Sequence, residues 1–339
     1  MKSDRFLIIR LSSIGDIILT TPLVRALRKA YPNALIDYLL KEEFLELLLD
    51  NPHIDNVYSL NSGNGLKEIF KWRKMIKRNG YTSILDLHRS IRSILMTSWL
   101  RRVEIAKLNK NLFKRFLLVN TGINLYKQIK PVTQRYFEAA VKFDLVDDGS
   151  GTELYHDGKI PNEIKTFLES KKIIVMAPGA GYLTKRWPPE YFAQLADKLI
   201  SNNNSEIFLI GSQSDREICH EIRKRMSNYV HDLSGNYSLL ETSAIIEASD
   251  AVIANDTGMM HVAVSQKKPV LAFFGSSTEE LGFFPYSENY QVLQNNDLNC
   301  RPCSHVGRDS CPKGHFKCMK DLSPELAYDS VIKLLDSKR

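Results

Sequence analysis

The feature that most constrains this chain is an alternation of short apolar runs with longer amphipathic stretches, and it occurs twice. In the first half, apolar runs of strand length occupy residues 5–10, 34–40, 56–59 and 82–87. Amphipathic stretches of helical period lie between them, at residues 17–27, 42–49 and 65–78. Strands that alternate with helices of these lengths predict a parallel sheet with helices on both faces.

The second half repeats this pattern. Strands are expected at residues 172–177, 206–210, 251–254 and 269–274. Helices are expected at residues 188–200, 215–226, 239–248, 257–265 and 324–335. We therefore predict an α/β protein of two doubly wound, Rossmann-like domains. Their sheets would face a central cleft at the carboxyl ends of the strands.

The two halves meet in a polar, glycine-containing segment, DDGSG at residues 147–151. We place an N-terminal domain at residues 1–155 and a C-terminal domain at residues 156–322. Residues 323–339 are predicted as a C-terminal helix that packs back on the N-terminal domain. Residues 101–130 are expected to be irregular and basic, and a helix is expected at residues 131–143.

Composition narrows the function classes. Hydrophobic residues make up 43% and charged residues 25%, the balance of a soluble globular protein. The apolar run at residues 6–9 is interrupted by Arg10 and then Asp16, so it is too short for an export signal, and we expect a cytoplasmic protein. The net charge of +7 suits anionic partners, although such an excess also serves solubility alone. The basic residues form no stripe, which disfavours nucleic acid.

The segment NDTGMMH, residues 255–261, follows a predicted strand and opens a predicted helix. The N–H groups of Thr257, Gly258 and Met259 would be free to bind a pyrophosphate at the helix N-terminus. Asp256 would be placed to bind sugar hydroxyls. A well-capped helix start without a ligand has the same pattern.

Two further loops follow strands of the same half. PGAGYLTKRWP, residues 178–188, brings Thr184, Lys185 and Arg186 to the carboxyl edge of the sheet. A basic pair ahead of a proline-initiated helix is the alternative interpretation. The loop from Gly211 to Asp215 is a candidate for the base or ribose of a nucleotide.

Other phosphate motifs are missing from the sequence. Thr184 stands where a dinucleotide fingerprint needs its third glycine, no Walker loop occurs, and no Asp-x-Asp pair is present. An NAD-dependent oxidoreductase and a metal-dependent, single-domain glycosyltransferase are therefore disfavoured.

In the first half, the turn SSIGD at residues 12–16 lies between the first strand and the first helix. Asp16 in the first turn of a helix has an ordinary explanation, since an anion there is stabilised by the helix dipole, by ~0.3–1 kcal/mol. A carboxylate at this edge would equally serve as a general base for an acceptor hydroxyl. The spacing alone leaves both interpretations open.

Four of the five cysteines crowd near the C-terminus, at Cys300, Cys303, Cys311 and Cys318. This spacing allows a structural zinc or iron–sulfur site, although it lacks the two Cys-x-x-Cys pairs of a zinc ribbon. Reduced, packed thiols are the alternative. We assign no catalytic role to the cluster.

Taken together, these motifs resemble glycosyltransferase family 9, the ADP-heptose:lipopolysaccharide heptosyltransferases. They occur in family order and span nearly the whole chain. The resemblance is carried by IIRLSSIGDIILTTP at residues 8–22, KRWPPEYF at 185–192, NDTGMMH at 255–261 and the cysteine block at 300–319.

The resemblance implies a GT-B fold, with the acceptor bound by the N-terminal domain and the donor, ADP-heptose, by the C-terminal one. It implies inverting transfer that needs no metal cofactor, with Asp16 as general base and Lys185 stabilising the leaving diphosphate. The donor contacts that it implies, together with the loop residues above, are Ser12, Ser13, Gly15, Thr184, Arg186, Gly211, Asp215, Asp256, Thr257, Gly258, Met259 and His261.

The acceptor implied by the resemblance is the anionic inner core of lipid A, carrying Kdo or heptose. Arg89 and Arg92 are candidate acceptor contacts, and exposed helix charges are the alternative. The basic stretch at residues 101–130 would suit phosphorylated lipid at the inner membrane face. Two other functions remain open: another nucleotide-sugar glycosyltransferase of the GT-B fold, and a non-catalytic protein that binds a nucleotide or sugar.

Overall fold

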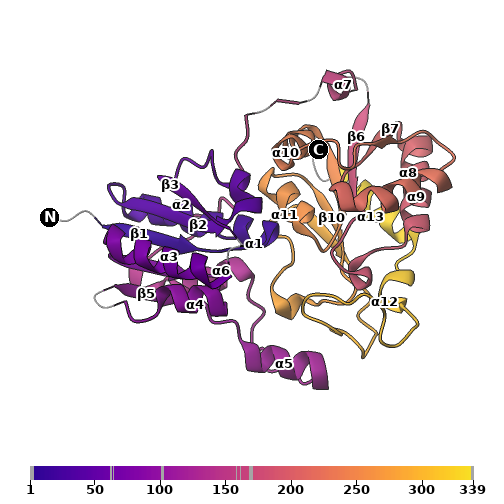
Figure 1. Cartoon of the computed structure of the whole chain (residues 1–339). Helices are drawn as coiled ribbons and strands as arrows, with labels where there is room; N and C mark the ends of the chain where they lie inside the picture. The colour runs from indigo at the N-terminus through magenta and orange to yellow at the C-terminus, as the bar shows by residue number, and fades with distance from the viewer. Residues whose placement is uncertain are drawn as a thin grey trace. The chain divides into compact units, whose positions relative to one another are not determined.

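A computed structural model describes residues 4–61, 63, 65–100, 103–157, 159–160, 162–167 and 171–336. The described chain forms two compact units (Figure 1). One contains residues from 1–110 and 132–155, and the other contains residues from 111–131 and 156–339. The segment 111–131 therefore belongs to the second unit although the first unit flanks it in sequence.

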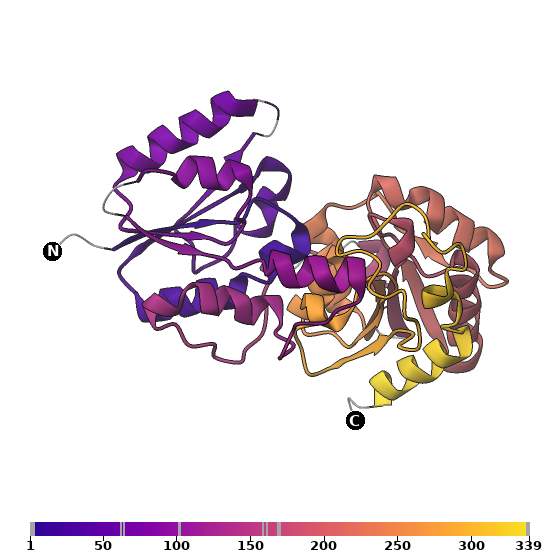
Figure 2. The same ribbon diagram turned by 90° about the horizontal axis from the view of Figure 1, so that it is seen from below.

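The first unit is a five-stranded parallel sheet in the order β3-β2-β1-β4-β5. Helices cover both faces, with α3 and α4 in contact on one side and α2 and α6 on the other (Figure 2). Its elements are β1 (Arg5–Ile9), α1 (Ile14–Ile18), α2 (Thr21–Ala30), β2 (Leu35–Lys41), η1 (Glu42–Leu47), β3 (Asn56–Leu60), α3 (Gly65–Asn79), β4 (Ser83–Asp86), α4 (Ile91–Thr97), β5 (Glu104–Lys107), α6 (Val132–Ala139) and η3 (Val141–Phe143).

The second unit is a six-stranded parallel sheet in the order β11-β10-β9-β6-β7-β8. Its elements are α5 (Leu112–Thr121), α7 (Asn162–Lys165), β6 (Lys172–Ala177), η4 (Leu183–Lys185), α8 (Pro189–Asn203), β7 (Ser205–Leu209), η5 (Gln213–Asp215), α9 (Arg216–Arg225), β8 (His231–Asp232), α10 (Leu239–Ala248), β9 (Ala251–Asn255), α11 (Gly258–Ser265), β10 (Val270–Phe273), η6 (Glu279–Leu281), β11 (Tyr290–Leu293), α12 (Lys317–Lys320) and α13 (Pro324–Asp336).

The central strands are buried along almost their whole length, because helices cover both faces of each sheet. This burial explains the continuous apolar runs of the sequence. The described part of the chain contains no helix that is both long enough and apolar enough to cross a membrane.

Several predicted elements differ from those observed. The first predicted helix is two helices, because the hydroxyls of Thr20 and Thr21 donate to the carbonyls of Ile17 and Ile18, and α2 restarts with Pro22 in its first turn. The helix predicted at residues 42–49 is the 3₁₀ segment η1. The basic stretch expected to be irregular contains β5 and α5.

The C-terminal helix differs most from its prediction. We expected it to pack on the N-terminal domain, but α13 lies in the core of the second unit. Ala327, Val331 and Leu334 recur at helical spacing and are buried in the cluster that also contains Trp187. This apolar stripe is buried against α8 and the second sheet, which α13 contacts directly.

A buried arginine anchors the end of the first unit. Arg25 on α2 donates two hydrogen bonds to Asp148, at 2.7 and 2.9 Å, and one to Glu153 at 2.5 Å. It also donates to the carbonyl of Gly151 at 3.0 Å. The polar segment that joins the two halves of the chain is therefore held against α2 by one guanidinium.

We expect Arg25→Met to reduce the free energy of unfolding by about 2–3 kcal/mol, because two carboxylates lose their buried partner. Fully buried pairs cost about 3–5 kcal/mol when one partner is removed, and these carboxylates are partly exposed. Urea unfolding measures the change. Arg225→Met removes an exposed pair with Glu221 and should cost no more than about 0.5 kcal/mol. Equal losses of stability in the two variants would contradict the role of Arg25 as the anchor of this segment.

Candidate active site

Each sheet has one point at which the strand order reverses. In the first unit it lies between β1 and β4, and in the second unit between β6 and β9. Ligands of open parallel sheets bind at the carboxyl ends of strands that flank such a point. The predicted residues follow these strands: Asp16 comes after β1, Lys185 after β6 and Asp256 after β9.

The second unit brings Lys185 and Asp256 together. Lys185 Nζ lies 2.8 Å from Asp256 Oδ2, and the two side chains are only 17% and 7% exposed. Ser277, in the loop after β10, donates its hydroxyl to the same oxygen at 2.6 Å. Loops from three adjacent strands therefore meet at one carboxylate.

Asn255, the last residue of β9, fixes the loop that carries Lys185. Its side-chain oxygen accepts a hydrogen bond from the backbone N–H of Trp187 at 3.0 Å, and its amide group donates to the carbonyl of Pro178 at 2.7 Å. The buried Trp187 ring stacks on Phe273 of β10 with centroids 4.2 Å apart. The loop is thus fastened to the sheet at both ends, and Lys185 has a defined position.

Helix α11 begins at this edge with Thr257 as its N-cap and Gly258 and Met259 in its first turn. The Thr257 hydroxyl does not cap the helix and is buried, with no hydrogen-bond partner in the described part of the chain. The same holds for the hydroxyls of Ser276 and Thr278 in the loop after β10. Buried hydroxyls and the free N–H groups of a helix start are suited to phosphate oxygens or sugar hydroxyls. His261 lies buried one turn further along α11.

Thr184 and Arg186 form hydrogen bonds with backbone groups that shape the loop after β6. Thr184 is buried, and its hydroxyl accepts a hydrogen bond from the backbone N–H of Arg308 at 2.8 Å. The Arg186 guanidinium donates twice to the carbonyl of Ala180, at 2.7 and 2.9 Å. These contacts shape the loop around Lys185, and the two residues stay predictions as donor contacts.

The loop after β7 lies against the loop after β6 through Asp215. Its carboxylate accepts hydrogen bonds from the backbone N–H and hydroxyl of Ser212, at 2.8 and 2.7 Å. A Cβ atom at Gly179 would lie 2.2 Å from Asp215 Oδ1, and one at Gly211 would lie 2.6 Å from Asp215 Cβ. Gly179 is therefore required for the close approach of the two loops, and Gly211 is required for the tight turn within the loop after β7.

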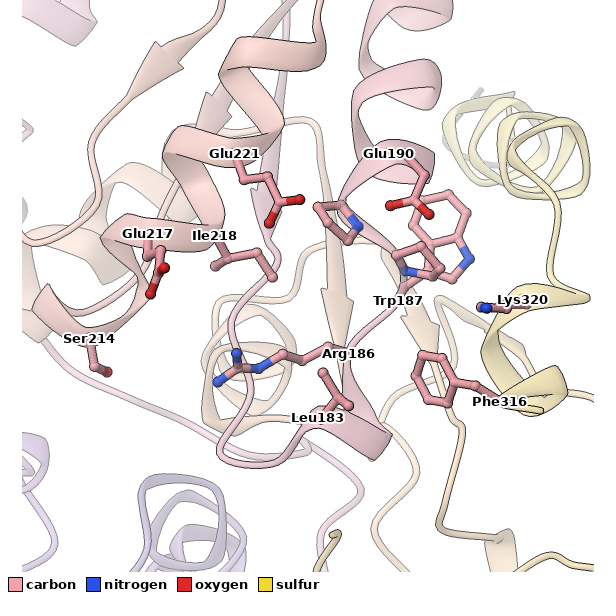
Figure 3. Close-up of a pocket in the computed structure, with 12 residues that line it drawn as sticks. Leu183, Arg186, Trp187, Glu190, Ser214, Glu217, Ile218, Glu221, Phe316 and Lys320 are labelled. Atoms are coloured by element: carbon pink, nitrogen blue, oxygen red, sulfur yellow. The ribbon is translucent and has the colours of Figure 1, made fainter. Parts of the chain in front are cut away.

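A cavity of about 380 Å³ lies beside these loops, between the starts of α8 and α9 and helix α12 (Figure 3). Glu190, Glu217 and Glu221 line it together with Arg186 and Lys320. Neither Lys185 nor Asp256 is among its lining residues. Because three carboxylates face this cavity, it is poorly suited to an anionic ligand.

Arg301 organises the segment after β11. Its guanidinium donates to the carbonyls of Gly275, Asn295, Phe274 and Ser277, at 2.5–3.0 Å, and to the side chain of Gln294. Because Ser277 donates in turn to Asp256, Arg301 holds the loop that positions this carboxylate. Neither Arg301 nor the hydroxyls at residues 276–278 were predicted as site residues, although GSST directly follows a predicted strand.

The cysteine block forms no metal site among the described residues, where no three His, Cys, Asp or Glu side chains are arranged to hold an ion. Cys300, Cys303, Cys311 and Cys318 are free thiols. Burial raises the pKa of Cys303 and raises that of Cys318 to about 12. The structural zinc suggested by the spacing is therefore unsupported.

In the first unit, Asp16 lies in the short helix α1, whose N-cap is Ser13 and whose second residue is the buried Gly15. Arg10 forms an ion pair with Asp16 at 2.5 Å, and the Ser13 hydroxyl donates to Asp16 Oδ2 at 3.0 Å. Arg10 also donates to the carbonyls of Ser12 and Leu87, at 2.9 and 2.7 Å. One guanidinium thus ties the ends of β1 and β4 to the carboxylate.

Burial alone would raise the pKa of Asp16, but the charge of Arg10 and hydrogen bonds from Arg10 and Ser13 outweigh it and hold the pKa below its usual value. Asp16 is therefore ionised at neutral pH, and its side chain is still 17% exposed. A carboxylate that is ionised, largely enclosed and accessible at one edge can accept a proton from a bound hydroxyl.

The loop after β4 carries the residues predicted to contact the acceptor. Arg89 is half-buried, with a nitrogen 3.9 Å from Asp86, whereas Arg92 is exposed on α4. Between β4 and Arg89 lies His88, which the sequence analysis did not identify. Burial, followed by the charges of Arg10 and Lys110, lowers its pKa to about 3. Its Nδ1 atom is buried and has no hydrogen-bond partner among the residues that the structure describes. His88 is therefore a neutral group beside the Arg10–Asp16 pair.

Solved structures share this architecture. A glycosyltransferase family 9 protein from Veillonella parvula has a TM-score of 0.80 and 21% identity, with 99% of this chain and 98% of that chain covered. The E. coli ADP-heptose lipopolysaccharide heptosyltransferase II has a TM-score of 0.73 and 23% identity, with 98% and 99% covered. The fold is of the GT-B type, and the chain is a glycosyltransferase.

The sequence comparison identifies the family. The profile of glycosyltransferase family 9 (heptosyltransferase) matches residues 69–312, so the chain belongs to this family. Lipopolysaccharide heptosyltransferase 2 of Salmonella typhimurium is 23% identical, with 98% of this chain and 99% of that protein covered.

We expect Gly179→Ala to reduce the free energy of unfolding by about 1–3 kcal/mol, since the new methyl group must displace the Asp215 carboxylate from its contacts with Ser212. Gly181→Ala is the matched control in the same loop. No atom of the described residues lies within 4 Å of its added Cβ, so the change should stay within about 0.5 kcal/mol. Urea unfolding of both variants is the measurement, and equal stabilities would contradict the close approach.

Proposed function

We propose that this enzyme transfers heptose from ADP-heptose to the inner core of lipopolysaccharide, with inversion at the anomeric carbon. The E. coli relative is named an ADP-heptose lipopolysaccharide heptosyltransferase and the Salmonella relative a lipopolysaccharide heptosyltransferase, and both align over nearly the whole of both chains. The observation that carries the proposal is the Lys185–Asp256 pair, together with the buried hydroxyls of Thr257, Ser276 and Thr278, which have no hydrogen-bond partner within the described chain.

The donor is assigned to the second unit. The N–H groups of Thr257, Gly258 and Met259 would bind the diphosphate, where the helix dipole favours negative charge. Lys185 would neutralise the charge that develops on the leaving ADP, which replaces the role of a metal ion. Asp256 would accept hydrogen bonds from heptose hydroxyls, and the Asp215 loop would receive the nucleoside.

The acceptor is assigned to the first unit, beside Asp16. Asp16 takes the proton of the acceptor hydroxyl while that oxygen attacks the anomeric carbon of heptose. The bond from this carbon to the β-phosphate oxygen breaks, and ADP leaves with the electron pair. Because a single displacement forms one bond as the other breaks on the opposite face, the configuration inverts.

Arg10 would keep Asp16 ionised and oriented until the acceptor arrives. An Asp with a lowered pKa is a weak base in water. A bound acceptor removes the remaining solvent from its exposed edge, and loss of solvent raises the basicity of a carboxylate. Arg89 and Arg92 would contact the anionic groups of the acceptor, which the enzyme would meet at the inner membrane face.

Thermal stabilisation distinguishes the donor from its alternatives. ADP-heptose and ADP should raise the melting temperature of the enzyme, whereas UDP and NAD should have little effect, because the sites for base and ribose would be specific for one nucleotide. Stabilisation by UDP instead of ADP would point to another nucleotide-sugar glycosyltransferase.

We expect Asp16→Asn to lower kcat by about 10²–10⁴, because the acceptor hydroxyl loses its general base. Turnover is measured in EDTA with ADP-heptose and a Kdo-containing acceptor. Donor affinity should be unchanged and the variant should remain folded, although loss of the partner of Arg10 should lower its melting temperature. Asp50→Asn, on an exposed carboxylate of the same unit, is the matched control. Unchanged turnover in Asp16→Asn would remove Asp16 from the mechanism.

We expect Arg10→Gln to move the acid limb of the kcat/KM profile to higher pH. In the wild type, Arg10 lowers the pKa of Asp16, so the base stays active as pH falls toward that lowered value. Without Arg10, burial prevails and the Asp16 pKa rises, so protonation inactivates the base at a higher pH. Arg10→Lys retains the charge and should shift the limb less. An acid limb that stays in place or moves to lower pH would contradict this role.

A further inference from the structure

The segment between β5 and α6 has an unusual charge pattern. No acidic residue occurs between Glu104 and Glu138, although acidic residues occur elsewhere about once in nine positions, 39 in 339. The same stretch contains the cations Lys107, Lys110, Lys114, Arg115, Lys127, Lys130 and Arg135. A stretch that contributes cations and no carboxylates of its own is complementary to an anionic partner. One carboxylate from outside the stretch contacts it, since Glu280 accepts a hydrogen bond from the Asn124 side chain at 3.0 Å.

Helix α5 lies within this stretch and presents apolar side chains to solvent. Phe113 is 70% exposed and Phe116 is 60% exposed, with Leu112 beside them. These residues are three and four positions apart, so they share one face of the helix. Leu118 is buried on another face and attaches α5 to the protein. The helix therefore points its aromatic face away from its own unit.

The chain after α5 continues the same surface. Ile123, Leu125 and Ile129 are exposed, and Lys127 is exposed among them. The Lys114 ammonium lies 5.8 Å from the centre of the Tyr126 ring, which joins this segment to α5. Apolar and basic side chains thus alternate over residues 112–130, which we call the α5 surface.

We propose that the α5 surface docks onto an anionic lipid bilayer, with Phe113 and Phe116 inserted at the boundary between headgroups and acyl chains. Aromatic and aliphatic residues beside cations are typical of helices that lie in this interface. Each Lys or Arg near the surface adds attraction to anionic headgroups. The inference rests on the proposed function, because a lipid-linked acceptor would then be reached by an enzyme held at its membrane.

A second copy of this chain suits the α5 surface less well. Two copies that met through it would place the same cations opposite one another, and the stretch supplies no carboxylate of its own to neutralise them. Glu280, which contacts the stretch, is a single carboxylate and is already hydrogen-bonded to Asn124. A helix of ten residues is also too short to cross a bilayer. A peripheral, interfacial position satisfies both the apolar and the basic side chains.

The test is flotation of the full-length protein with vesicles of phosphatidylethanolamine, with or without phosphatidylglycerol. The wild type should bind the anionic vesicles, and Phe113→Ser/Phe116→Ser should weaken binding by about tenfold or more. Tyr229→Ser, which removes an aromatic ring 67% exposed elsewhere on the second unit, should bind as the wild type does. Unchanged binding by the double variant would overturn the proposal.

A charge variant tests the attraction between the cations of the α5 surface and the anionic headgroups. Lys114→Gln/Lys127→Gln should weaken binding to the anionic vesicles, whereas Lys224→Gln/Lys333→Gln, on exposed lysines of α9 and α13, should have little effect. Equal losses would show that net charge, and not the α5 surface, drives binding and would overturn the assignment. So would a wild-type dimer that Phe113→Ser/Phe116→Ser dissociates, since a second copy would then occupy this surface.

The vesicle assay contains neither donor nor acceptor, so it is independent of catalysis. Turnover of an acyl-free, water-soluble acceptor should be unchanged in both α5 variants. Vesicle binding without any heptosyl transfer would sink the proposed function and leave this inference standing. Heptosyl transfer without vesicle binding would overturn this inference and leave the proposed function standing.

Discussion

The pairing of β6 with β9 determines where the chemistry of the second unit lies. These strands are far apart in sequence but adjacent in the sheet, with Ala177 opposite Ala254 at their carboxyl ends. After β6 the chain continues to β7 on one side of this pair, and after β9 it continues to β10 on the other side. The Lys185 loop and the start of α11 therefore both begin at the same point of the sheet edge. The Asn255 side chain then hydrogen-bonds to both ends of that loop, which fixes the position of the loop relative to the start of α11.

Both carboxylates proposed to act in the reaction are held by a cation in the same unit. Asp16 is paired with Arg10 and Asp256 with Lys185, and each pair is largely shielded from solvent. The partners differ in freedom: Arg10 is committed to two backbone carbonyls, whereas Lys185 has a flexible stem and a compact charge. A fixed partner suits a carboxylate that must keep one orientation. A movable partner suits a cation that must turn toward a diphosphate.

The sequence predicted the parallel sheets and the loops at their carboxyl edges, because a continuous apolar run bounded by glycines and polar residues is a local pattern. It did not predict Arg301 or His88, since their importance comes from partners brought near by the fold. It suggested a metal site from cysteine spacing, which says nothing about the direction of the thiols. The packing of α13 was also missed, because an apolar stripe does not specify which core will cover it.

The path of the chain between the two units has a practical consequence. Residues 111–131 lie with the second unit, but residues on either side of them lie with the first, so the chain passes between the units three times. No single cut can therefore separate two intact halves. A fragment that ends near residue 155 would carry α5 without the rest of its unit, and the complementary fragment would lack α5 altogether.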